Sequence, residues 1–155
     1  MENWENNLKD FPDRRTGLRF RYEKSVTPEV KIACMQFANW LRLTYYFPLR
    51  VPVYIKGTKT VQTTDGEKAV GTFFEPFSYS NEPYIRIATG DYSELKTALG
   101  RDNALAAILS TIAHELTHYY QWINDVQLTP IGRERQATRY SKLIVYEYSL
   151  TREHP

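Results

Sequence analysis

The spacing of apolar residues changes twice along the chain and divides it into three parts. In the first part, apolar residues recur every three or four positions between Ile32 and Tyr45, which predicts an amphipathic helix over about 28–46. Thr27 followed by Pro28 is typical of a helix start, with threonine as the cap and proline at the first helical position. We expect this helix to bury one face.

The residues before this helix, 1–26, have no such period. They are polar, and their basic side chains alternate with Asp10, Asp13 and Glu23. This mixture favours a solvated N-terminal arm over a nucleic-acid contact. The basic residues are Lys9, Arg14, Arg15, Arg19, Arg21 and Lys24.

The middle part alternates apolar and polar residues, which is the period of a β-strand. Strands are predicted from Val51 to Ile55, over about 69–75 and over Tyr84–Ala88. Asp65 and Gly66 form a strong turn signal between the first two. We therefore expect a small, mostly antiparallel sheet.

The last part is helical again. Apolar residues at three- and four-residue spacing predict one helix over about 103–123 and another over about 133–151, with a break at Pro130. The order is helix, strands, helix, helix, which predicts an α+β fold rather than an alternating parallel one. The 155 residues have the length of a single domain, so residues 1–155 are interpreted as one unit.

Composition narrows the class of protein. The formal net charge is only +2, which argues against a dedicated nucleic-acid binder. Cys34 is the only cysteine, so neither an internal disulfide nor a cysteine-based zinc cluster can form. We find no apolar run long enough to cross a membrane and no signal-peptide pattern near the N-terminus. A cytoplasmic protein without a membrane partner is the expectation; the oligomeric state is left open.

The candidate chemistry lies in the predicted helix 103–123, which contains His-Glu-Leu-Thr-His from His114 to His118. Residues four positions apart lie above one another on a helix, so both imidazoles can reach one metal ion. Glu115 is rotated by about 100°, which places its carboxylate beside the metal, where it can deprotonate a bound water. The sequence therefore predicts Glu115 as a general base and one zinc ion per chain.

A catalytic zinc site needs a third protein ligand. Glu134 is the preferred candidate, because a turn separates it from His118 and it shares a helical stripe with apolar residues. Asp125 and His154 remain alternatives. Glu147 is about 20 Å further along the last helix, so it cannot share the site.

These residues resemble the zincin metallopeptidases, in particular the glutamate-liganded gluzincins. The segment from Glu134 to Thr138 is similar to that of small intracellular peptidases of the ImmA/IrrE type. The resemblance implies a minimal zincin-like fold, zinc held by His114, His118 and Glu134, and endopeptidase activity on a peptide or protein substrate. Thr138 departs from the family, where Asp or Asn orients a ligand histidine.

The zincin resemblance also implies that substrate binds along an edge strand, for which Tyr84–Ala88 and Gly71–Phe74 are the candidates. Peptide hydrolysis also needs a hydrogen-bond donor, besides the metal, to the negative charge of the tetrahedral intermediate. Four side chains on the last helix are candidates for this donor. They are Arg139, Tyr140, Tyr146 and Tyr148.

Two other functions are compatible with the sequence. One is a catalytically silent zincin-like interaction module, in which the metal is structural or absent. The other is a nucleic-acid-associated protease similar to SprT-like proteins, although these carry a third histidine ligand.

Overall fold

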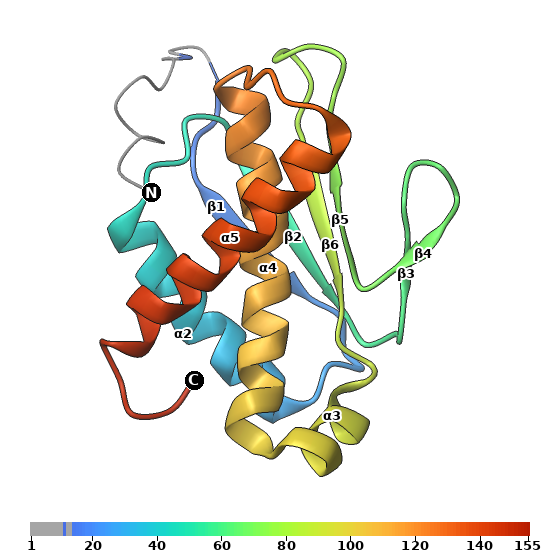
Figure 1. The fold of residues 1–155 in the computed structure, drawn as a ribbon, viewed down its shortest axis with the longest axis vertical. Coiled ribbons are helices and arrows are strands. Elements are labelled where there is room, and N and C mark those ends of the chain that lie inside the picture. The colour runs from blue at the N-terminus through green and yellow to red at the C-terminus, as the bar shows by residue number, and fades with distance from the viewer. Residues whose placement is uncertain (1–10, 12–13) are drawn as a thin grey trace.

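Residues 11 and 14–155 are described by a computed structural model, and they form helices and strands in an α+β arrangement (Figure 1). The α+β class predicted from the order of elements is therefore confirmed. The elements are β1 (Leu18–Tyr22), α2 (Pro28–Thr44), β2 (Val51–Lys56), β3 (Val61–Gln62), β4 (Lys68–Ala69), β5 (Gly71–Phe74), β6 (Tyr84–Ala88), α3 (Tyr92–Leu99), α4 (Arg101–Ile123) and α5 (Pro130–Ser149).

The main sheet is mixed, with strand order β1-β2-β6-β5. β2 pairs in parallel with both β1 and β6, and only β5 runs antiparallel to its neighbour. The expectation of a mostly antiparallel sheet is therefore wrong. The reason is β1: with α2 it makes a strand–helix–strand crossover, and such crossovers join parallel strands.

β1 lies within residues 1–26, where an extended arm was predicted. Leu18 and Phe20 point into the core and are buried, whereas Arg19 and Arg21 point outward and are exposed. Only five residues carry this alternation, and the arginines between the apolar residues concealed it. Arg19 and Arg21, which were predicted to lie in the arm, therefore belong to a strand of the sheet.

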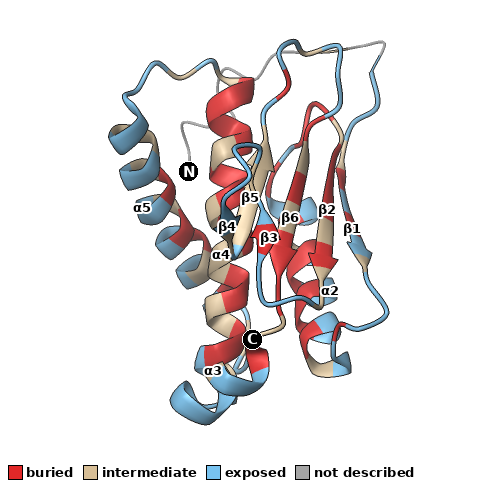
Figure 2. Ribbon diagram, turned by 90° about the vertical axis from the view of Figure 1, so that its right-hand side faces the viewer, coloured by how far each residue is buried: buried red, intermediate tan, exposed pale blue. Residues whose placement is uncertain are grey.

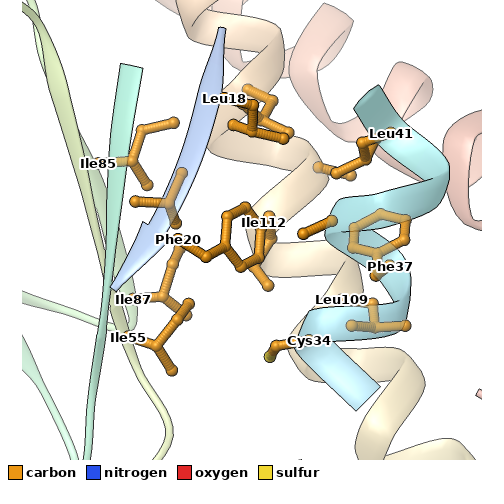
Figure 3. Packing of buried hydrophobic residues seen from close by; sticks show 14 of the residues in the cluster. Leu18, Phe20, Cys34, Phe37, Leu41, Ile55, Ile85, Ile87, Leu109 and Ile112 are labelled. Carbon is orange, nitrogen blue, oxygen red and sulfur yellow. The ribbon is translucent and has the colours of Figure 1, made fainter. Parts of the chain in front are cut away.

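The helices α2 and α4 pack on the same face of the main sheet (Figure 3). Strand residues that point to this face fill the core together with apolar residues of both helices, and most are fully buried. The core residues labelled in Figure 3 are Leu18, Phe20, Cys34, Phe37, Leu41, Ile55, Ile85, Ile87, Leu109 and Ile112. In Figure 2, α5 lies outside α4, on the side away from the sheet.

The predicted helices are present, with shifted boundaries. α5 begins three residues earlier than predicted, at Pro130, because Thr129 caps it by accepting a hydrogen bond from the Gly132 N–H at 3.0 Å. Proline at the first helical position is a start signal here rather than a break. The short helix α3 was not predicted.

The predicted Asp65-Gly66 turn closes the β3-β4 hairpin, which is separate from the main sheet. Gly66 has φ of 81°, a conformation that glycine adopts without strain. Within the described residues, no helix has the length and apolar character needed to span a bilayer.

Candidate metal centre

α4 has one side buried in the core and one side facing α5. Ile108, Ile112 and Leu116 are buried, as expected for the packed side. His114 and His118 lie on the other side, with 24% and 12% of their side-chain surface exposed. Their rings are 5.0 Å apart between centroids, so the two imidazoles face one common point.

Glu134, in the first turns of α5, supplies the carboxylate at this point. One of its oxygens lies 3.0 Å from Nε2 of His114 and the other 3.0 Å from Nε2 of His118. The structure therefore brings together the three predicted ligands, and their ligand atoms all lie within 4.8 Å of one another. Two ligands of a tetrahedral zinc ion are separated by about 3.3 Å, so small shifts would accommodate the ion.

The expected orientation of Glu134 needs one correction. It was predicted to face the core with the apolar stripe of the last helix, but its side chain is 63% exposed. The residues that follow on this stripe are buried, namely Ala137, Ser141, Ile144 and Tyr148. Glu134 sits where the stripe leaves the core, so its carboxylate reaches the histidines from the solvent side.

The hydrogen bonds of His118 fit a metal ion at this point. Nδ1 of His118 lies 2.7 Å from Oε1 of Gln121, and the Gln121 amide donates to the carbonyl of Arg133 and to Gln136. Gln121 is thereby fixed as the acceptor, and Nδ1 of His118 as the donor. A neutral imidazole then has a lone pair on Nε2, and this lone pair faces the Glu134 carboxylate. A cation between them would relieve this repulsion.

Burial shifts the pKa of both groups next to this point. Desolvation lowers the pKa of His118, which favours the neutral imidazole that binds a metal. Desolvation, helped by the Glu134 charge, raises the pKa of Glu115 to about 8. A positive ion nearby would favour the Glu115 carboxylate and oppose this shift.

Glu115 lies beneath strand β5, where Gly71 leaves room for it. A methyl group at Gly71 would lie 2.8 Å from Cγ2 of Thr111 and 3.2 Å from Oε1 of Glu115. Because Gly71 has no side chain, β5 can approach α4 closely at Glu115, the residue predicted as the general base. Sequence analysis did not single out Gly71.

A cleft of about 570 Å³ contains the three candidate ligands and Glu115. β5 forms one wall, Thr63 of the hairpin and the start of α5 form others, and Arg133 also lines it. Arg133 lies 3.4 Å from a carboxylate oxygen of Glu75 on the opposite wall.

The four donors predicted on the last helix are not among the lining residues of this cleft. Tyr148 instead packs in the core against Phe37 and Trp40, and the Arg139 guanidinium lies over the Tyr140 ring. Tyr146 is exposed. Arg133, which was not predicted, is the cationic side chain at the cleft.

The alternative third ligands lie elsewhere. His154 contacts Asp102 at 2.8 Å, at the start of α4 and about 18 Å along the helix from His114. Asp125 follows the end of α4 and binds Gln127. Glu147 accepts a hydrogen bond from Tyr45.

No family model, curated protein or solved structure matches the chain. Its function is therefore inferred from the residues and geometry of this site.

Proposed function

We propose that the protein is a zinc-dependent endopeptidase of the zincin type. The observation that carries the proposal is the convergence of His114, His118 and Glu134, whose ligand atoms lie within 4.8 Å of one another above a buried Glu115. Two histidines and one carboxylate, with room for water, are the donor set of a catalytic zinc site. A zinc ion bound here would lower the pKa of a bound water and polarise a carbonyl.

Glu115 is the proposed general base. Its carboxyl group has little contact with solvent, and this desolvation raises its pKa, whereas a zinc ion beside it would favour the carboxylate form that accepts a proton. Such a group can accept a proton from the attacking water and then donate it to the leaving amine. This assigns to Glu115 both proton transfers of peptide hydrolysis.

The strand β5 is the proposed platform for the substrate. It is at one edge of the main sheet, whereas β6, the other candidate, is an inner strand. Its hydrogen bonds to β6 alternate, and Val70 accepts from Ala88, so the backbone groups of Gly71 and Phe73 point away from β6. An extended peptide could pair with them and lie across the cleft.

The test uses the full chain loaded with zinc and a casein labelled with a self-quenched fluorophore. We expect fluorescence to increase with wild type and to stop when a chelator removes the metal. Glu115→Gln should retain zinc and lose at least about 10²-fold in rate, because only the base is removed. Equal rates for wild type and Glu115→Gln would overturn the proposal, as would a protein that binds no zinc.

A further inference from the structure

No described helix covers the second face of the main sheet, although strand β3 contacts β5 and β6, and Pro52 and Ala88, which alternate to this face, are buried. Side chains alternate along each strand, so residues next to the core residues point to the opposite side. Every described helix that packs on the sheet lies on the core side (Figures 2 and 3). Parallel strands usually have both faces covered, which makes an open face on this sheet unusual.

Aromatic rings and cationic groups gather on this open face. The Phe74 and Tyr84 rings stack with centroids 4.8 Å apart and planes 15° apart. The Arg86 guanidinium lies 4.8 Å from the centre of the Tyr84 ring, and Tyr54 contacts the edge of that ring. Planar groups from three neighbouring strands thus form one platform.

Positive charge surrounds this platform. Arg19 and Arg21 on β1 are exposed, and the strand register places Arg21 beside Tyr54 and Tyr54 beside Arg86. Within residues 11 and 14–155, no carboxylate forms an ion pair with Arg19, Arg21 or Arg86. Lys56 is paired with Glu23. Arg19, Arg21 and Arg86 thus add positive charge to one face, without a carboxylate partner among the described residues.

More arginines adjoin the same face at the edge formed by β1. Arg15, Arg19, Arg42 and Arg50 line a hollow of about 530 Å³. Two of these guanidinium groups already have partners: Nε of Arg42 donates to the Leu18 carbonyl at 2.9 Å, and Nε of Arg50 lies 3.8 Å from a carboxylate oxygen of Glu82. Guanidinium groups in this number around a hollow favour an anionic ligand, and phosphate suits their geometry.

We infer that the open face of the sheet binds single-stranded nucleic acid. The arginines of β1 and its edge would contact phosphates, and Phe74 and Arg86, which both lie against the Tyr84 ring, would stack with unpaired bases. Proteins bind single strands without sequence preference by stacking bases on aromatic rings and arginine side chains next to a cationic groove. An acidic peptide would match the charge but would leave the aromatic platform unexplained. The site lies on the opposite side of the sheet from the candidate metal centre, and the inference is independent of zinc.

The experiment measures fluorescence anisotropy of a labelled oligo-dT and a labelled oligo-U of about 15 nucleotides, a length typical of such sites. We expect binding by wild type that weakens at least tenfold between about 50 and about 200 mM salt, as phosphate contacts require. Duplex DNA of the same length and poly-glutamate should compete poorly. Absence of binding at low salt would overturn the inference, as would stronger competition by poly-glutamate or duplex.

Two pairs of variants separate this face from general charge attraction. Arg19→Gln with Arg21→Gln should weaken binding at least tenfold. Arg135→Gln with Lys142→Gln removes the same charge from exposed positions of α5. Because α5 lies outside the proposed face, this pair should change the affinity less than about twofold. Equal losses for both pairs would overturn the assignment.

The aromatic platform has its own matched pair. Phe74→Tyr retains an aromatic ring, whereas Phe74→Leu retains apolar volume and loses the ring. We expect near wild-type affinity for the first and a loss of about fivefold or more for the second, in line with the loss of one stacked base. Thermal unfolding of each variant verifies that the sheet is intact; equal affinity of the two variants would rule out stacking on Phe74.

Discussion

The Nδ1 atom of His118 lies 2.7 Å from Oε1 of Gln121, one helical turn further along α4. Gln121 is almost completely buried, and its amide is held by the Arg133 carbonyl and by Gln136. In a metal site it would orient His118, a role for which the gluzincin resemblance offered no residue at Thr138. A ligand histidine whose second nitrogen is held in this way has a fixed tautomer and ring orientation.

Gln121→Ala should weaken zinc binding by about 10–100-fold, because His118 loses the group that orients it. Gln121→Glu keeps an acceptor oxygen for Nδ1 but loses the two hydrogen bonds that the amide donates, so it should bind zinc more tightly than Gln121→Ala and unfold at a lower temperature than wild type. Competition with a fluorescent chelator measures both affinities. If the alanine variant binds zinc as tightly as the wild type, Gln121 does not position the ligand.

Glu134→Ala should greatly weaken zinc binding, because it removes the only carboxylate that approaches both histidines among the described residues. It should also lower the thermal stability of the zinc-loaded protein, since zinc would connect α5 to α4. His154→Ala is the control, because this histidine binds Asp102 at the other end of α4. Loss of zinc in the control but not in Glu134→Ala would mean that the third ligand is a histidine.

The three long helices α2, α4 and α5 were predictable from the sequence because each carries a stripe of apolar residues over many turns, whereas the short α3 does not. The two candidate histidine ligands followed from the same reasoning, since a helix places residues four apart on one side. Glu134 was chosen as a core-facing residue of the last helix, although its side chain is exposed. β1 was missed because only two of its five residues are buried on the core face, Leu18 and Phe20, with arginines between them. Strand direction was then wrong, because it depends on which strands pair across long separations.

Two parts of the site also depend on contacts between distant segments. Arg133 lines the cleft because α5 begins beside α4 and β5. The residues around Arg133 in the sequence do not indicate which other elements lie beside the start of this helix. Gly71 matters because this residue of β5 faces Thr111 and Glu115, which both lie on α4 and are far from it in the sequence. Gln121 was accessible in principle, since three-residue spacing places it next to His118 on a helix.

The stability of the metal-free protein should depend on Glu115. The pKa of its carboxyl is about 8 in the folded chain and 4.5 for an exposed glutamate, so the folded state holds the proton more tightly. The resulting stability is complete below about pH 4.5 and is lost as pH rises toward 8, by at most about 1.4 kcal/mol per pH unit. His118, whose pKa is lowered, contributes in the opposite direction, because its folded-state stability increases as the pH rises.

Denaturant unfolding with chelator present, at several pH values between about 5 and about 8, would measure this effect. Glu115→Gln is neutral at every pH, so its free energy of unfolding should not show the decrease that we expect for wild type. The difference between the two proteins isolates Glu115 from other titrating groups. Parallel pH profiles would contradict the shifted pKa.

Gly71→Ala should reduce both stability and peptidase activity, because the added methyl group has no space. It would lie 2.8 Å from Cγ2 of Thr111 and 3.1 Å from Cγ of Glu115, so β5 or the base must move. Overpacking of this kind costs about 1–3 kcal/mol, and displacement of Glu115 should lower kcat more than it raises KM.

Thr111→Ser provides the decisive comparison for Gly71→Ala, because it removes the methyl group that makes the closest contact and keeps the hydroxyl that bonds to Ala107 at 3.1 Å. The double variant should recover part of the stability and activity lost in Gly71→Ala, whereas Thr111→Ser alone should have little effect. Zinc content should be unchanged throughout, since the ligands are not touched. If the double variant were no better than Gly71→Ala, the close approach of β5 to α4 would not be what positions Glu115.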